Sequence, residues 1–252
     1  MHLGPSSVGR FRYTRVLLTT ALLTIIIIIG NPSRLQAQAG ISFYSSNTPP
    51  TGMGSLQPLI AKWWDFDSNQ PSRIHNSWPI CLKGDVTIGN RSIVFLGDPA
   101  SAPVGDVNLN ATHQVCQISS SQLLHLIVYS GFCSQSDSPG KSIPQLLACA
   151  QDTNKIIKLM KATVDDVDVT SNIIHATSSQ PFILSVHSQD NAFAEKLNPT
   201  CCGEAMAENY FLLFKHIPVG HHTITAEVIR VPLQANQPVE HDLAKWNINV
   251  VR

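Results

Sequence analysis

Histidine is the most unusual component of this chain, with ten residues among 252 although only 13% of the side chains are charged. His216, His221 and His222 surround the turn Pro218–Gly220. Other groups that can ligate a metal precede them, namely Cys201, Cys202, Glu204, Met206 and Glu208. Imidazole, thiolate and carboxylate groups are typical ligands of zinc and copper. Because neighbouring residues on a strand point to opposite faces, we favour structural roles, and a metal site at His216, His221, His222 and Glu204 is the alternative.

Two groups of aspartates could also carry chemistry. Asp65 and Asp67 flank Phe66 and would share one face of a strand, where paired carboxylates can perform acid–base catalysis or bind calcium. Asp165, Asp166 and Asp168 crowd a turn, but the glycine and the later glutamate of an EF-hand loop are missing there. We therefore interpret the second group as a solvated turn.

Aromatic and imidazole side chains in apolar surroundings favour a core rather than a binding site. Trp63 and Trp64 could stack on a sugar ring, although a tryptophan pair beside a strand-rich domain more often packs into its core. His125 lies within the apolar run 123–129, and we interpret it as a core histidine whose ring nitrogens have partners.

Short catalytic motifs are absent from the sequence. Gly140-Lys141-Ser142 ends like a phosphate-binding loop, but Gln135 occupies the position where that loop requires glycine. Neither the Gly-x-Ser-x-Gly elbow of serine hydrolases nor the His-Glu-x-x-His helix of zinc proteases occurs. We assign no catalytic residue, no cofactor and no resident metal, and a non-enzymatic role is favoured.

Charge and hydropathy indicate export. The 17 basic and 17 acidic residues balance, which excludes a strongly basic nucleic-acid-binding protein. Residues 1–39 contain four arginines and no acidic residue, and the apolar run 16–30 is short for a membrane-spanning helix but suits a signal peptide. Ala37-Gln38-Ala39 matches a signal-peptidase site, with Gly40 as the new N-terminus. The alternative is an uncleaved N-terminal membrane anchor; both place the rest of the chain outside the cytoplasmic membrane, secreted or at its outer face.

Cysteine usage agrees with an oxidising compartment. All six cysteines follow residue 39, and an even number in an exported chain indicates disulfides. Pairing nearest neighbours gives Cys81–Cys116 and Cys133–Cys149, and the state of Cys201 and Cys202 stays open. Asn90 and Asn110 begin glycosylation sequons beside turn-forming residues.

The elements that would position these residues are mostly short strands. Residues 40–58 have the composition of a flexible lead-in, and residues 59–252 read as one domain of antiparallel strands, an immunoglobulin-like or jelly-roll-like β-sandwich. One short helix is expected at 145–152, with Ser142 as its cap and Pro144 in its first turn. The strand 221–231 follows the turn Pro218–Gly220 in a hairpin and alternates between an apolar and a polar face. Further strands are expected at 86–88, 92–96, 115–118, 123–129, 156–164, 167–169, 183–186, 210–214 and 246–251.

A set of short motifs in this order resembles an uncharacterised family of exported archaeal and bacterial β-sandwich proteins. The motifs are Trp63-Trp64, Pro79-Ile80-Cys81, Ile93–Gly97, His113–Cys116, Cys133, Cys149, Ala162–Asp165 and Pro218–Ile224. The resemblance supports the β-sandwich and both predicted disulfides, and it implies no catalytic residue.

These observations lead to one functional expectation. We expect an exported, disulfide-stabilised β-sandwich that acts as a binding or structural module of the cell envelope, with a protein or glycan partner. No nucleic acid is expected as a partner, and contact with the membrane would come only through an uncleaved N-terminal segment. The alternative is an extracytoplasmic metal-binding protein or metalloenzyme that uses the region of His216, His221 and His222.

Overall fold

A computed structural model of the chain describes residues 40–70, 81–88, 90–97, 115–186, 203–231 and 239–252, with only the backbone described at 81–86 and 115. The described residues belong to one compact unit, Gly40–Arg252. The predicted signal segment, residues 1–39, lies outside the described residues. Gly40, which follows the predicted cleavage site, is the first described residue. None of the described helices is long and apolar enough to cross a membrane.

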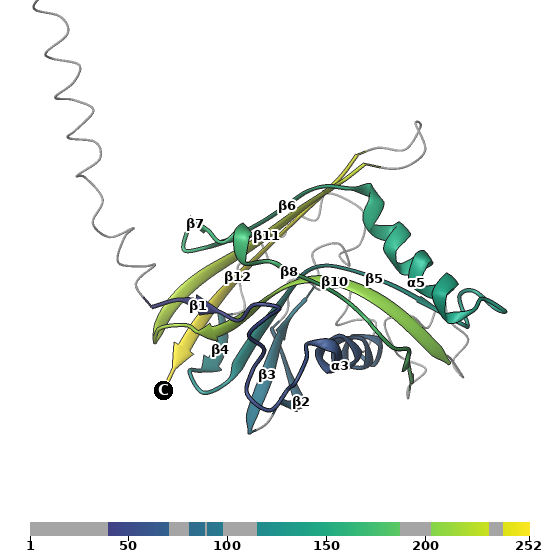
Figure 1. The fold of residues 1–252 in the computed structure, drawn as a ribbon. Helices are drawn as coiled ribbons and strands as arrows, with labels where there is room; N and C mark the ends of the chain where they lie inside the picture. Colours follow the sequence, from purple (N-terminus) through teal and green to yellow (C-terminus); the bar gives the residue numbers. More distant parts are fainter. Residues whose placement is uncertain (1–39, 71–80, 89, 98–114, 187–202, 232–238) are drawn as a thin grey trace, which may run out of the picture. The chain divides into compact units, whose positions relative to one another are not determined.

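Two β-sheets form the framework of the described part (Figure 1). The seven-stranded sheet has the order β1-β10-β5-β3-β2, with β8 and β9 also pairing with β10. Its strands are β1 (Ser42–Phe43), β2 (Cys81–Ile88), β3 (Arg91–Leu96), β5 (Leu123–Ser134), β8 (Ile174–Thr177), β9 (Phe182–Ile183) and β10 (Glu204–His216). The five-stranded sheet has the order β4-β12-β11-β6-β7. Its strands are β4 (Val115–Ser119), β6 (Ile157–Val164), β7 (Val167–Asp168), β11 (Gly220–Arg230) and β12 (Glu240–Val251).

The main core lies between the two sheets and confirms the predicted β-sandwich. On β11, Ile224, Ala226 and Val228 are completely buried, as the alternation in the sequence predicts. They join the same apolar cluster as Leu126 of β5 and Leu212 of β10. Side chains of alternate residues from both sheets therefore form this core, which is how sandwiches bury apolar surface.

Two helices cover parts of the seven-stranded sheet on opposite faces (Figure 1). Helix α3 (Gln57–Ser68) packs Leu59 and Trp63 into a second apolar cluster with Phe95 and Phe211. Helix α5 (Ile143–Asp152) packs Leu146 against Cys133 and Met206. The short 3₁₀ turns η2 (Thr153–Ile156) and η3 (Thr170–Asn172) follow α5 and β7 respectively.

Helix α5 confirms the helix predicted around 145–152. Ser142 is its N-cap residue, and Gln145 Oε1 accepts hydrogen bonds from the Ser142 backbone N–H at 2.8 Å and from its hydroxyl at 3.0 Å. The predicted disulfide Cys133–Cys149 is present and fastens α5 to β5. Gly131 of β5 allows the end of this helix to approach, because a Cβ there would lie 2.9 Å from the Ala150 carbonyl oxygen.

The segment around Asp65 and Asp67 is helical, and the prediction that these residues share a strand face is wrong. In α3 the two carboxylates are two residues apart and so point in different directions. Asp65 is exposed whereas Asp67 is buried. Pro58 suits the first turn of a helix, and the next apolar residues recur at helical spacing.

Three further features differ from the expectations. Two strand pairs, β3–β5 and β12–β4, are parallel within a mainly antiparallel fold. The turn Pro218–Gly220 joins strands of different sheets, so the hairpin partner of β11 is β12 and not β10. The lead-in 40–58 contributes β1 to the sheet and Leu56 to the core, because backbone pairing with β10 does not depend on an apolar composition.

Candidate functional site

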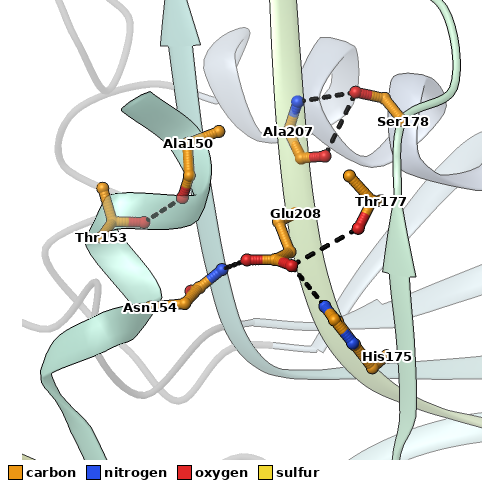
Figure 2. A network of polar contacts seen from close by, with 8 residues as sticks. All are labelled: Ala150, Thr153, Asn154, His175, Thr177, Ser178, Ala207 and Glu208. Carbon is orange, nitrogen blue, oxygen red and sulfur yellow. Dashed lines mark hydrogen bonds and ion pairs between the residues drawn. The ribbon is translucent and has the colours of Figure 1, made fainter. Parts of the chain in front are cut away.

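Glu208 is a buried carboxylate at the centre of a polar cluster on β10 (Figure 2). The cluster consists of Glu208, Asn154, His175 and Thr177, and Figure 2 shows it between β8 and η2. Glu208 Oε2 accepts a hydrogen bond from the Asn154 side-chain amide, and Oε1 is bonded to His175 Nε2. Thr177 Oγ1 donates to Oε1 at 3.4 Å. Because an unpartnered buried carboxylate is strongly unfavourable, these contacts explain how Glu208 is accommodated.

Strand register places the members of this cluster. Thr177 lies opposite Glu208 and His175 lies opposite Tyr210 in the antiparallel pair β8–β10. Asn154 comes from η2, directly after α5. The seating of α5 against Gly131, which lies opposite Glu208 on β5, therefore also sets the position of Asn154.

Backbone anchors keep both sides of the cluster in place. Ser178, next to Thr177, accepts a hydrogen bond from the Ala207 N–H at 2.8 Å and donates one to the Ala207 carbonyl at 3.1 Å. Thr153, next to Asn154, donates to the Ala150 carbonyl at 2.7 Å. Figure 2 shows these bonds on the two sides of Glu208.

His175 forms the exposed side of the cluster. Half of its side chain (50%) is exposed, compared with 6% for Glu208. Its ring stacks on Tyr210, with ring centroids 4.5 Å apart and planes 5° from parallel. Burial and the nearby Glu208 carboxylate raise the pKa of the Tyr210 hydroxyl. The result is a flat, partly exposed ring pair fixed by a buried acid.

A carboxylate that binds one imidazole nitrogen fixes the orientation and tautomer of the ring. In this geometry Nε2 of His175 faces Glu208, which leaves Nδ1 as the second polar atom of a half-exposed ring. The pair is therefore suited to hydrogen bonding with a bound partner at Nδ1. The stacked rings add a flat apolar contact surface.

Sequence reasoning named Glu208 only as a group near the histidines, and it missed Asn154, His175 and Thr177. The one local signal is Glu208 itself, since a charged residue within the largely apolar run 205–214 indicates a buried acid that needs partners. Nothing in the sequence links this position to His175, which is 33 residues away.

The structure separates the histidines that the sequence groups together. His222 points inward and its two ring nitrogens are bonded to Asp165 and to the Pro218 carbonyl, at 2.7 and 2.9 Å. His221, its neighbour on the strand, is exposed, and His216 is exposed at the end of β10. Glu204 lies at the opposite end of β10, where its carboxylate accepts a bond from Gln135 at 3.2 Å. No group of three potential metal ligands occurs among the described side chains, and Cys201 and Cys202 lie outside them.

The turn aspartates divide into a bonded residue and an exposed one. Asp165 and Asp166 both have positive φ angles, 51° and 63°, in the tight turn between β6 and β7. The Asp165 carboxylate accepts bonds from the His222 ring and from the Thr223 N–H, so the solvated-turn interpretation does not hold for it. Asp166 is exposed. At Asp168, hydrogen bonds from Thr170 lower the pKa of the carboxyl.

His125 is a core residue, but the expectation that its ring nitrogens have partners is wrong. Its side chain is buried among Trp63, Phe95 and Phe211, and neither ring nitrogen has a hydrogen-bond partner. Burial lowers the pKa of this imidazole to about 3. Trp63 and Trp64 are also buried, so neither ring is available for stacking on a sugar.

The remaining predicted positions fall partly within the described residues. Cys116 is disulfide-bonded, whereas the side chain of Cys81, its predicted partner, lies outside the described part. Asn90 is exposed in the turn between β2 and β3, and Asn110 lies outside the described residues.

Comparisons with known proteins give little further information. No family model and no curated protein matches the chain. Among solved structures, the chain is similar to the cysteine protease inhibitor EhICP2 from Entamoeba histolytica, over 55% of this chain and 87% of that one. The sequence identity is 11% and the TM-score is 0.22. A similarity at this level carries no argument about the function of this chain.

Proposed function

We propose that the chain is exported and acts outside the cytoplasmic membrane as a binding or structural module of the cell envelope. The disulfide Cys133–Cys149 is the observation that carries the export proposal, because such bonds persist in oxidising compartments and are rare in the cytoplasm. The arginine-rich, apolar N-terminus and its Ala37-Gln38-Ala39 site support it. Membership of the exported β-sandwich family that the motifs resemble is part of the same proposal.

The surface proposed to contact the partner is the His175–Tyr210 pair. The half-exposed imidazole offers one polar atom, and the stacked rings offer a flat surface on a rigid sheet. Rigid aromatic side chains with a polar atom contribute contact area at a low entropic cost. A protein or glycan of the envelope is the partner class that fits such a surface.

The alternative metal-binding role loses its geometric basis in the described residues. His222 uses both ring nitrogens for bonds within the protein, and His216 and His221 do not converge with Glu204 on one point. We therefore propose no metal chemistry for this region.

Export is tested by thiol labelling in the cells that make the protein. Intact cells are treated with a membrane-impermeant maleimide before and after reduction, and Cys133 and Cys149 are mapped by mass spectrometry. We expect labelling of both residues only after reduction, together with a mature N-terminus at Gly40. Free thiols at these positions, reached only after lysis, would contradict export.

Binding is tested separately with the purified chain and isolated envelopes of the same cells. We expect saturable retention that His175→Gln weakens, because glutamine can still donate to Glu208 but removes the ring. His216→Gln is the matched control, since it changes an exposed histidine elsewhere. Equal retention of both variants would exclude the His175–Tyr210 surface while leaving the export result unaffected.

A further inference from the structure

One face of β5 holds the end of helix α5 and the start of η2. Three alternate residues of the strand make the contacts: Tyr129, Gly131 and Cys133. Cys133 is bonded to Cys149 of the helix, and the Tyr129 hydroxyl donates to the Thr153 carbonyl at 3.1 Å. Between them, Gly131 lies so close to the helix end that a Cβ there would overlap Thr153 Oγ1, at 1.9 Å. Because alternate residues of a strand share a face, these contacts follow one another along a line.

The disulfide lies one step along the sheet from Glu208. Cys133 is two residues from Gly131, and Gly131 lies opposite Glu208 in the pair β5–β10. Positions two residues apart on a strand are separated by about 7 Å. Asn154 follows Cys149 closely in the sequence and reaches Glu208 from the side of η2 (Figure 2). The position of the helix end therefore decides whether the Asn154 amide meets the buried carboxylate.

The disulfide is the strongest single contact that holds the helix end. Helix α5 has ten residues, which is too short for stability on its own, and its buried side chains are those of Leu146 and Ala150. A cross-link over 16 positions favours the closed state by about 100-fold. A neutral hydrogen bond such as that from Tyr129 to Thr153 contributes about tenfold or less. Breaking the cross-link therefore leaves the helix end attached but open much more often.

Asn154 lies between a fixed point and a releasable one. After it, the Ile156 carbonyl accepts a backbone bond from the Val231 N–H at 2.7 Å. Before it, Thr153 is continuous with the end of α5. When α5 opens, η2 stays attached at Ile156, and the Asn154 side chain moves away from Glu208.

Glu208 passes this movement on to the exposed rings. Asn154 donates to Glu208 Oε2, whereas Oε1 is bonded to His175 Nε2. Without Asn154, one oxygen of a carboxylate that is only 6% exposed loses its donor, so the carboxylate reorients towards water. The same carboxylate orients the His175 ring, whose stacking on Tyr210 then loosens.

We infer that the Cys133–Cys149 bond is a redox-sensitive control of the His175–Tyr210 surface. Asn154 is the positioning residue that connects the two. The oxidised chain presents an ordered ring pair, and the reduced chain presents a disordered one in an otherwise folded sandwich. The role of this surface in binding rests on the proposed function, whereas the structural coupling does not.

The chemical step is thiol–disulfide exchange with a dithiol, either a small molecule or a protein. A thiolate of the dithiol attacks the sulfur of Cys149, which is half-buried, whereas Cys133 is only 6% exposed. The Cys133–Cys149 bond breaks and Cys133 leaves as a thiolate. The second thiol of the dithiol then releases Cys149 from the mixed disulfide. Two electrons pass to the bond, the two cysteines take up two protons, and the dithiol becomes a disulfide.

The coupling is tested by the ring-nitrogen NMR signals of His175 in the purified chain, identified with His175→Gln. We expect the oxidised chain to show the tautomer with a proton on Nε2, which donates to Glu208. The variant with Cys133→Ala and Cys149→Ala and the variant Asn154→Ala should each show a mixture of tautomers. Adding both cysteine changes to Asn154→Ala should cause no further change, because the bond acts through Asn154.

Two controls separate this coupling from a general loss of stability. Asn172→Ala removes an asparagine from the other 3₁₀ turn, η3. Asp165→Ala removes the bonds to His222 and Thr223 in the turn between β6 and β7. Both should leave the His175 signals unchanged, and thermal melting shows that each variant is folded.

The redox step is tested by treating the folded wild type with dithiothreitol. Alkylation and mass spectrometry should find Cys133 and Cys149 as thiols while the circular dichroism of the sandwich is retained. The His175 signals should then match those of the variant that lacks both cysteines. That variant should not respond to the reductant, which excludes effects from the other cysteines. Retention on isolated envelopes should fall by about fivefold or more on reduction.

The outcomes distinguish this inference from the proposed function. His175 signals that are unchanged by loss of the bond, equal changes in the Asp165→Ala variant, or a bond that is reduced only when the chain unfolds would each overturn the inference. Changed signals without any retention by envelopes, oxidised or reduced, would support the coupling and contradict the proposed binding role. Retention that depends on His175 but not on the bond would overturn the control and leave the proposed function intact.

Discussion

His222 of β11 is bonded to Asp165 in the turn after β6, with His222 Nδ1 2.7 Å from Asp165 Oδ2. The other ring nitrogen lies 2.9 Å from the Pro218 carbonyl oxygen. Asp165 also accepts a bond from the Thr223 N–H at 2.8 Å. One side chain thus joins the turn between β6 and β7 to the start of β11.

We predict that Asp165→Ala lowers the free energy of unfolding by about 1–3 kcal/mol, because the Thr223 N–H and the His222 ring lose their acceptor. Alanine also tolerates the positive φ angle of this turn less well than aspartate. Asp165→Asn is the matched control, since asparagine tolerates the same φ angle and can still accept from Thr223, so the loss should be smaller. Urea unfolding measures both, and equal losses would argue against the role of the carboxylate.

We predict that His125 makes the protein sensitive to acid. The unfolded chain protonates this imidazole below about pH 6.5, whereas the folded chain keeps it neutral until pH about 3. The free energy of unfolding should therefore fall across this window as the pH decreases, by up to about 4–5 kcal/mol. His125→Leu should remove this component and, at neutral pH, stabilise the fold, because it removes two buried nitrogens without partners.

The test of this prediction compares urea unfolding of the wild type and His125→Leu at several pH values between 3 and 8. The gap between the two should widen as the pH falls. His216→Leu is the matched control, because it makes the same replacement at an exposed histidine outside the core. A constant gap for His125→Leu would show that the ring is not shielded from protons.

We predict that Glu208→Gln destabilises the protein by about 1–3 kcal/mol. The amide N–H₂ would face the donor groups of Asn154 or His175, so at least one bond of the cluster is lost. Because the Glu208 charge contributes to the raised pKa of Tyr210, the same change should move that pKa towards its usual value. Alkaline absorbance titration, with Tyr210→Phe identifying the signal, measures the shift; an unchanged titration would place the charge too far from the hydroxyl.

We predict that replacing Cys133 and Cys149 with alanine costs about 3 kcal/mol, the value expected for a cross-link spanning 16 positions. The loss should be concentrated in the docking of α5, so hydrogen exchange should accelerate in α5 and at Asn154 before it does so in β11 and β12. Uniform acceleration along the whole domain would show that the bond stabilises the fold globally rather than this helix.

How far the sequence predicts this structure depends on whether the signal is local. The alternation from His222 to Val228 predicts which face of β11 is buried, because successive side chains of a strand point to opposite faces. Helix α5 also has a local signal, because Ser142 is a favourable N-cap residue and Pro144 suits the first turn. Helix α3 carried a helical spacing from Leu59 to Asp67 that the expectation of a shared strand face overlooked.

Other features have no local signal. Strands β1 and β8 are short and unpatterned, and the open edge of β10 determines their position. The Glu208 cluster joins residues from η2, β8 and β10, and only the packing of α5 and the register of β8 bring them together. His125 looks like an ordinary core residue in the sequence, because the lack of partners for its nitrogens is a property of the surrounding side chains.

The outer edge of β10 also has a consequence for the order of folding. Three separate segments cover it: β9 at its start, β8 in its middle and β1 at its end. Ser42 pairs with His216 although the two residues are far apart in the sequence. Such long-range contacts form slowly because a long loop must close first. A chain in the process of folding therefore exposes the unpaired, largely apolar edge of β10 until these segments arrive. The yield of native protein therefore depends on whether these segments pair with β10 before two partly folded chains associate.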